Sequence, residues 1–279
     1  MREIQASAIT AAVSSMCIEA NCVLPGDVCR HISYCHERES WEPAKNILGR
    51  IVENFEIAKR EGVPICQDTG MAFVFVEIGQ DVRVVGDLGK AINEGVRQGY
   101  TEGFLRLSVV DDPLRRQNTN DNTPAMIYYD IVPGDGFKIT VMPKGFGAEN
   151  MSQLFMMPPS VGWEGVKTFV VRAVERAGAN PCPPIVVGVG IGGTFDKVAL
   201  LAKKALLRQV DDKHPDPYYS ALEDELLEEI NELGIGPQGF GGQTTALAVK
   251  IETMETHIAG LPVAVNINCH VVRHITKEL

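Results

Sequence analysis

Residues 63–79 read VPICQDTGMAFVFVEIG, and the character of the sequence changes within this stretch. The run MAFVFVEIG, residues 71–79, is apolar and rich in β-branched and aromatic residues, which predicts a buried strand. Directly before it, residues 66–69 place a thiol, an amide, a carboxylate and a hydroxyl side by side. Polar groups are costly to bury unless they are hydrogen-bonded, so a structural or functional role must account for this cluster. Cys66 is therefore a core residue, a nucleophile or a metal ligand.

The segments on either side of this stretch predict a mixed α/β (α+β) chain. Residues 1–62 predict mostly helix, because apolar residues recur there at helical spacing. Residues 63–279 predict a mixed sheet flanked by helices. No repeat or linker stands out, so we expect a single domain, 1–279. Further strands are expected at 124–132, 137–145, 185–190, 246–256 and 262–274, and further helices at 87–101, 163–177, 194–210 and 221–233.

The composition excludes some classes of function. The formal net charge is −10, and an acidic chain repels a polyanion, so we expect no nucleic-acid partner. No run of 18 or more apolar residues occurs, which indicates no membrane span, and the N-terminus lacks the apolar core of a secretory signal. We therefore expect a cytoplasmic protein, in which the seven cysteines are reduced thiols or ligands rather than disulfides.

Four of the cysteines lie near the N-terminus, at positions 17, 22, 29 and 35. Structural zinc sites use closely spaced cysteine pairs, and no pair here is that close. Cys17 and Cys22 lie among Ala, Val, Ile and Met residues, where cysteine behaves as a small hydrophobe. We expect these cysteines to pack in the core.

The segment GVGIGG, residues 188–193, fits the spacing of a dinucleotide-binding motif. The acidic residue that such a site needs is Asp211 or Asp212, but no second strand is predicted to place it. We therefore favour a Gly-rich turn that approaches a packed neighbour or an anion. A nucleotide-binding oxidoreductase remains an alternative. Phosphate-loop and nucleophile-elbow motifs are absent.

The other three cysteines have unusual settings. Cys66 stands at the start of a predicted strand, Cys182 is surrounded by prolines, and Cys269 follows an apolar strand and precedes His270. A scattered cysteine is usually a core residue, but thiolates are also the ligands of iron–sulfur clusters. Three such ligands would leave one iron of a cubane cluster open, able to act as a Lewis acid on a substrate oxygen.

Several motifs together give a resemblance to a known family. ICQDTG, FLRLSVVDDPL with NTNDNTPA, PKGFGAEN, NPCPP, GVGIGGT and NINCHVVRH resemble the α subunit of two-subunit class I (iron–sulfur) fumarate hydratases, over nearly the whole chain. The related L-tartrate dehydratase α subunit is equally similar. The resemblance implies a [4Fe–4S] cluster held by Cys66, Cys182 and Cys269. It also implies reversible hydration of fumarate to L-malate, a step of the tricarboxylic acid cycle, with L-tartrate dehydration as the alternative.

The resemblance also implies roles for other residues. Asp68 is expected to do acid/base work, although aspartate also caps turns such as Thr69–Gly70. Arg106 is expected to bind a substrate carboxylate, against the alternative of a surface salt bridge. His257 is an active-site histidine or a structural one. The remaining substrate-binding residues are expected to be Gln67, Lys144, Gly145 and Gly147, although Phe146 and Ala148-Glu149 depart from the small residues common in the family.

A second carboxylate site and a carbon base are still missing from this set. In the family they come from a β portion, so the resemblance implies a β subunit as partner, in an α2β2 heterotetramer, and a small dicarboxylate as substrate. We expect the chain alone to bind a cluster and to be inactive. A non-catalytic, cluster-binding regulatory protein is the other alternative.

Overall fold

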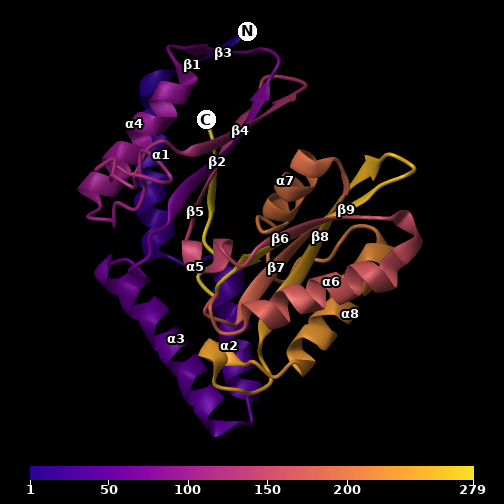
Figure 1. The fold of residues 1–279 in the computed structure, drawn as a ribbon. Coiled ribbons are helices and arrows are strands. Elements are labelled where there is room, and N and C mark those ends of the chain that lie inside the picture. Colours follow the sequence, from indigo (N-terminus) through magenta and orange to yellow (C-terminus); the bar gives the residue numbers. More distant parts are fainter. The chain divides into compact units, whose positions relative to one another are not determined.

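In the computed structural model, which describes residues 1–279, the chain divides into two units (Figure 1). Each unit is assembled from segments that are separate in the sequence. Unit 1 consists of Met1–Leu24, Phe55–Phe146 and Arg273–Leu279, and unit 2 consists of Pro25–Asn54 and Gly147–Val272. The mixed α/β fold class is confirmed. The single domain, 1–279, stays a prediction, because a division into units does not show which parts fold independently.

Unit 1 contains a four-stranded sheet with the strand order β10-β5-β2-β4. Strand β2 pairs in parallel with β4 and antiparallel with β5, and β10 pairs antiparallel with β5. The bounds are Met71–Gly79 for β2, Met126–Val132 for β4, Phe137–Lys144 for β5 and Ile275–Glu278 for β10. A small parallel sheet joins β1 (Arg2–Gln5) to β3 (Val82–Val85), and the helices are α1 (Ala6–Cys22) and α4 (Leu88–Glu102).

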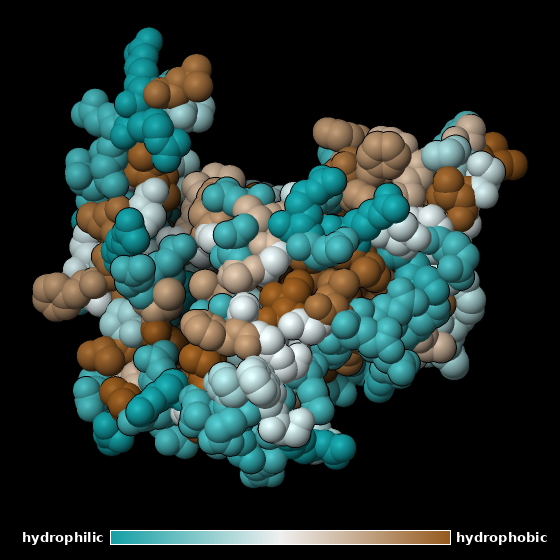
Figure 2. Space-filling model, turned by 60° about the horizontal axis from the view of Figure 1, so that its bottom comes forward, coloured by the Kyte–Doolittle hydropathy of each residue, from teal (hydrophilic) through white to brown (hydrophobic).

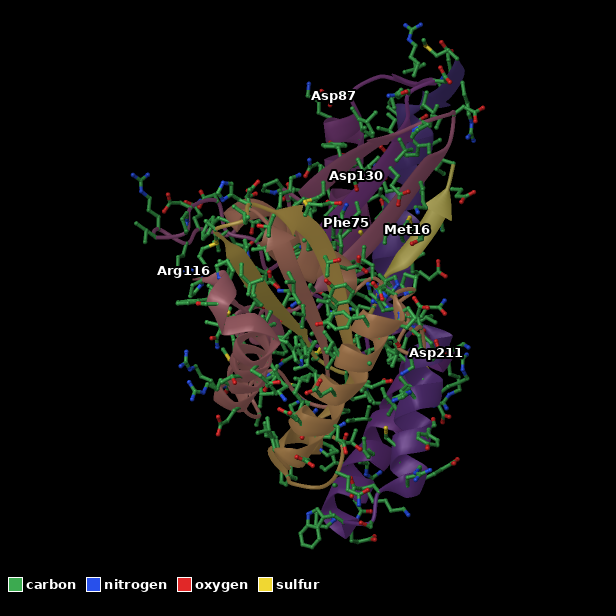
Figure 3. The ribbon with its side chains drawn as sticks, turned by 90° about the vertical axis from the view of Figure 1, so that its right-hand side faces the viewer. Met16, Phe75, Asp87, Arg116, Asp130 and Asp211 are labelled. Carbon is green, nitrogen blue, oxygen red and sulfur yellow. The ribbon has the colours of Figure 1, made fainter.

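The core of unit 1 lies between one face of this sheet and helices α1 and α4. Alternate residues of β2, such as Val74 and Val76, share a buried cluster with α1, because successive side chains of a strand point to opposite faces. Met16 of α1 is fully buried there (Figure 3). Phe75, which lies between the two valines, instead stacks on Tyr128 with ring centroids 5.2 Å apart.

One helical stretch, Ala6–Arg38, has the length and composition of a membrane span. Half of its most apolar window is buried in the chain, and it is interrupted at Pro25, where α1 has ended and α2 (Gly26–Arg38) begins. Cys17 and Cys22 are buried on α1, as the sequence predicts, and burial raises the pKa of the Cys17 thiol to about 12. This burial is typical of a helix in the core of a folded chain.

Unit 2 contains a second four-stranded sheet with the order β6-β9-β7-β8. Strand β7 pairs in parallel with β8 and antiparallel with β9, and β6 pairs antiparallel with β9. The bounds are Gln153–Met157 for β6, Ile185–Gly193 for β7, Ala246–Thr256 for β8 and Leu261–Asn268 for β9. Helices α6 (Gly162–Ala177) and α8 (Pro217–Glu232) share the main core of the sheet, and α7 (Phe195–Ala205) contributes to a smaller core with β9.

Two helices lie where the chain passes between the units. Helix α3 (Glu42–Glu61) passes from unit 2 into unit 1 after Asn54, and α5 (Phe146–Glu149) lies where the chain returns to unit 2.

The face of the chain in Figure 2 is largely hydrophilic, with hydrophobic residues in smaller groups between the hydrophilic ones. That surface is in keeping with a formal net charge of −10.

The glycines of residues 188–193 do not form the Gly-rich turn that the sequence predicts. They lie inside strand β7, where a Cβ on Gly188 would be 2.1 Å from the carbonyl oxygen of Ala202 and one on Gly190 would be 2.3 Å from that of Val198. Both carbonyls belong to α7, so the glycines allow this helix to pack directly on the strand. From the sequence, a packed neighbour or an anion is expected beside these glycines. The structure shows a packed neighbour, helix α7.

The segment β7-α7-α8-β8 is a βαβ unit, which the sequence analysis does not predict. A single residue, Thr194, connects β7 to α7, which leaves no loop for a pyrophosphate. Asp211 accepts a hydrogen bond from Arg30 at 2.9 Å (Figure 3) and is held at a salt bridge rather than at a ribose site. The structure therefore gives no support to dinucleotide binding at this motif.

The packing at Gly188 gives a prediction about stability. We expect Gly188→Ala to lower the free energy of unfolding by about 1–3 kcal/mol, because the new methyl group must displace α7. Gly136→Ala is the matched control, since a Cβ there meets no atom within 4 Å. Urea unfolding of both variants measures the difference, and equal stabilities would contradict the packing role of Gly188.

Two predicted elements end several residues earlier in the structure. The helix expected at 194–210 ends at Ala205, and the strand expected at 262–274 ends at Asn268. The second difference matters, because Cys269 and the residues after it leave the sheet and form a loop. Strands β1, β3, β6 and β10 and helix α5 are not predicted from the sequence.

Candidate active site

In unit 1, the loop that contains Cys66 connects α3 to β2. The Ile65 N–H donates to the carbonyl of Asn21 at 2.9 Å, which ties the start of the loop to the last turn of α1. The Cys66 Sγ accepts a hydrogen bond from the Asp68 N–H at 3.4 Å. Hydrogen bonds of this kind stabilise a thiolate, which is the form in which cysteine binds metals. Gln67, between these two residues, is exposed.

The Asp68 carboxylate caps the turn, as one of the two expectations for it requires. Its Oδ1 accepts from the Gly70 N–H at 3.0 Å, and its Oδ2 accepts from the Phe146 N–H at 3.0 Å. A Cβ on Gly145 would lie 2.8 Å from this Oδ2. The carboxylate therefore holds the backbone of residues 145–146 against its own loop, and its acid/base role stays a prediction.

Strand register brings Lys144 to the same place. Met71 of β2 pairs with Lys144 of β5, so Gly70 lies beside the end of β5. A Cβ on Gly70 would be 2.6 Å from the Lys144 carbonyl carbon, and the φ of Gly70 is +75°, so the position requires glycine. The Lys144 side chain is fully buried. Unit 1 thus gathers three predicted site residues, Asp68, Lys144 and Gly145.

Arg106 joins this group through its backbone. Its N–H donates to Thr69 Oγ1 at 2.9 Å, and the Thr69 hydroxyl donates to its carbonyl at 3.2 Å. The Arg106 side chain is exposed, and none of the salt bridges of the chain includes it. The structure thus shows no salt bridge for Arg106, and its binding of a substrate carboxylate stays a prediction.

Arg273 is a site residue that sequence reasoning misses. It is 2% exposed, its Nη2 donates to the Asp68 carbonyl at 2.6 Å, and its Nε donates to the Pro143 carbonyl at 3.2 Å. The guanidinium therefore fastens the Cys66 loop to the end of β5. The Nη1 is buried without a partner, which is costly and unusual for a charged group. The only sequence signal is an arginine that directly follows Val271 and Val272.

In unit 2, Cys182 and Cys269 lie at the same end of the sheet. Val186 of β7 pairs with Asn268 of β9, so the residues before β7 and those after β9 are neighbours. A direct bond confirms this, since His270 Nδ1 lies 2.9 Å from the Cys182 carbonyl oxygen. Cys182 has a φ of +54°, an unusual conformation for a residue with a side chain, and strain of this kind clusters at functional sites.

The remaining predicted residues of unit 2 lie in different places. Gly147 is exposed on α5, and a Cβ on it would be 3.5 Å from the carbonyl of Asn180, in the turn before Cys182. His257 lies in the exposed turn between β8 and β9. A strand rises about 3.3 Å per residue, so β9, with 8 residues, places His257 about 25 Å from Cys269. Unit 2 does not bring these two residues together.

The donor set fits a thiolate-bound metal group. All seven cysteines are free thiols, and Cys66, Cys182 and Cys269 are each at least partly accessible, whereas Cys17 is deeply buried. Within either unit, no group of three or more His, Cys, Asp or Glu side chains is arranged to hold a metal ion. Unit 1 offers one loop thiol, and unit 2 offers two on adjoining loops.

A family model described as "Fumarate hydratase (Fumerase)" matches residues 10–278. The chain belongs to this family. A putative L(+)-tartrate dehydratase subunit alpha from Methanocaldococcus jannaschii is 45% identical over 268 residues, which cover 94% of each chain. An L(+)-tartrate dehydratase subunit alpha from Escherichia coli UTI89 is 33% identical over 260 residues, covering 92% of this chain and 86% of that protein.

These findings confirm the family resemblance and the class of reaction. The chain is a hydro-lyase of the fumarate hydratase and L-tartrate dehydratase α subunit family. The match extends over both units, so the loops that contain Cys66, Cys182 and Cys269 all lie inside it.

Proposed function

We propose that this chain is the cluster-carrying α subunit of a cytoplasmic [4Fe–4S] hydro-lyase. With a β subunit, in an α2β2 heterotetramer, it would catalyse the reversible hydration of fumarate to L-malate, a reaction of the tricarboxylic acid cycle. The α subunit names of the relatives support the partner, and the family description supports the reaction. Cys66, Cys182 and Cys269 would hold the cluster.

The arrangement of unit 1 is the observation that carries this proposal. A thiol with a backbone hydrogen bond, a carboxylate and an unpaired guanidinium occur within one network that also includes Lys144 and Gly145. The thiol, the carboxylate and the backbone of Arg106 are held by backbone or side-chain hydrogen bonds, so their geometry is set before a ligand arrives. Preorganised polar groups of this kind are what a dicarboxylate hydration needs.

When bound, the cluster would supply a Lewis-acidic iron that activates the substrate hydroxyl. Residues of this chain would bind the substrate, orient it and move a proton. Arg106 would bind a substrate carboxylate with its planar fork of donors. Gln67, exposed beside Cys66, and the backbone at residues 144–147 would orient the substrate. Asp68 would move a proton to or from the substrate hydroxyl, since each of its oxygens retains a further lone pair.

His257 enters the proposal as a group that contacts a substrate carboxylate or relays a proton. Its Nδ1 accepts a hydrogen bond from the Ala259 N–H at 3.2 Å, which fixes the ring in its turn. The proposal gives His257 no step beside Cys182 and Cys269, because β9 separates it from them.

Dehydration of L-tartrate is the second candidate. The two relatives described above carry that name, and one of them is 45% identical to this chain. In the dehydration direction, both reactions remove a hydroxyl group from one carbon and a proton from the adjacent carbon of a four-carbon dicarboxylate. The same α subunit residues would therefore serve either reaction. The choice therefore depends on the groups that contact the second half of the substrate.

The requirement for a partner gives a prediction. We expect the purified chain, reconstituted with iron and sulfide under anaerobic conditions, to bind a cluster and to show no turnover. Activity should appear when it is co-expressed with the β subunit, because the family resemblance places the second carboxylate site and the carbon base on the β portion. Anaerobic assays with fumarate, L-malate and L-tartrate measure the result.

The outcomes separate the candidates. Turnover of fumarate and L-malate alone supports the fumarate hydratase, and turnover of L-tartrate alone supports the second candidate. Rapid turnover by the chain without a β subunit would contradict the assignment of the missing groups to a partner. A cluster that forms but shows no activity with the β subunit present would favour a regulatory protein.

A further inference from the structure

The segment Gly236–Gly242, which we name the glycine loop, contacts the turn that contains Cys182. Its Gln238 is not a glycine, yet it has a φ of +54°. A Cβ on Gly239 would lie 2.5 Å from the Cβ of Ala179, whose carbonyl accepts from the Cys182 N–H at 3.0 Å. The glycine loop therefore packs directly on the backbone that positions Cys182.

Gln238 makes two hydrogen bonds to one atom of this turn. Both its backbone N–H and its side-chain Nε2 donate to the Pro183 carbonyl oxygen, each at 2.8 Å. Pro183 directly follows Cys182, so the pair of bonds fixes the direction in which the chain leaves the cysteine. A glutamine held at a positive φ is strained, and such strain persists only where the surroundings enforce it.

His270 makes the corresponding connection from the other cysteine. The Cys182 carbonyl can only accept, so its 2.9 Å contact places the hydrogen on His270 Nδ1. This nitrogen then cannot accept from Gln238 Nε2, which lies 3.4 Å away, so the second contact is packing. Gln238 thus supports the histidine ring that ties the residue after Cys269 to the Cys182 carbonyl.

We infer that Gln238 is a positioning residue that holds the loops of Cys182 and Cys269 so that their thiolates bind one metal group together. The inference rests on the proposed function, in which both cysteines are cluster ligands. Partners of this kind orient the ligands of a metal, and their loss typically lowers metal affinity by about 10- to 100-fold.

The test measures binding of cobalt(II) to the cluster-free full chain. All measurements use a chain with Cys66→Ser, which removes the loop thiol of unit 1. The thiolate-to-cobalt absorption then reports on Cys182 and Cys269. Adding Cys182→Ser to this chain gives the absorption expected without the paired site. Two variants are compared. Gln238→Glu keeps the shape of the side chain but loses its donor, and Gln238→Gly removes the side chain and relieves the positive φ.

We expect both variants to bind cobalt(II) about tenfold more weakly than the Cys66→Ser chain. The melting temperature of Gln238→Gly should not fall, because glycine suits this backbone, so the change in affinity is separated from a loss of folding. Gln243→Glu is the matched control, since its exposed side chain lies in the next turn and bonds only to Ser40 Oγ. Its affinity should equal that of the parent.

Unchanged cobalt(II) affinity in Gln238→Gly would overturn the inference. So would an equal loss in Gln243→Glu, or a Cys66→Ser chain that shows no thiolate-to-cobalt absorption. The measurement needs neither a cluster nor turnover, so failure of the proposed hydratase activity is distinguishable from failure of this inference.

Discussion

Replacing Cys182 or Cys269 by serine should abolish the visible absorbance of the anaerobically reconstituted chain and remove its activity with the β subunit. We expect this result because serine is a poor ligand for an iron–sulfur cluster and the remaining thiols cannot substitute. Loss of Lewis-acid activation costs several kcal/mol of transition-state stabilisation, which corresponds to a rate decrease of about 10³-fold or more. Iron and sulfide content, visible spectra and turnover measure the effect. Cys66→Ser should behave in the same way.

Two other cysteines provide the controls for this experiment. Cys29 is a partly buried thiol of unit 2, and Cys22 is a buried thiol of unit 1. Their serine variants should keep the cluster, because both lie on helices, outside the loops that contain Cys66, Cys182 and Cys269. Loss of the cluster in Cys22→Ser with a normal melting temperature would contradict the division into core cysteines and ligands.

Replacing Asp68 by asparagine should lower kcat by about 10²- to 10⁴-fold, the usual contribution of a general acid or base. The substitution also has a structural cost, because the amide has one accepting oxygen and its NH2 only donates, so it cannot accept from both Gly70 and Phe146 as the carboxylate does. One backbone N–H then loses its partner, which costs about 1–3 kcal/mol of folding free energy. Steady-state kinetics and thermal unfolding of the same preparation separate the two effects.

Asp112→Asn is the control for the loss of a turn-capping carboxylate charge. Its Oδ1 accepts from the N–H groups of Leu114 and Arg115, which lowers the pKa of its carboxyl group, but it lies in an exposed turn. Because the remaining Oδ1 can still accept both hydrogen bonds, this variant should keep its kcat and lose less stability than Asp68→Asn. If Asp68→Asn keeps kcat as well, Asp68 only caps its turn and another group moves the proton.

The sequence predicts the longer elements well, because their character is local. Strands β2 and β8 have the predicted bounds, since continuous β-branched and aromatic runs need no partner to be recognised. Strand β10 is only 4 residues long and pairs with β5, far away in the sequence, so its existence depends on a register that local patterns do not contain. Strand β7 continues through Gly188–Gly193 because α7 packs on those glycines, against the usual low preference of glycine for strands.

For the candidate site as well, the sequence predicts the local motifs but not the contacts between remote segments. Residues 66–70 and 144–145 are found from motifs, and their proximity follows from the pairing of β2 with β5. The spacing between His257 and Cys269 looks short in the sequence, but the intervening residues form an extended strand, which maximises their separation. Gln238, His270 and Arg273 act through backbone carbonyls of remote segments, and a single sequence gives no signal for such contacts.

The chain leaves unit 1 at Phe146 and returns to it only at Arg273. During synthesis on the ribosome, the Cys66 loop therefore emerges long before the arginine that fastens it and the strand β10 that covers the edge of β5. Unit 2 can complete its contacts in the interval. Unit 1 must wait with an open sheet edge and an unsecured thiol loop, and an open edge of this kind is prone to pair with other chains until β10 covers it.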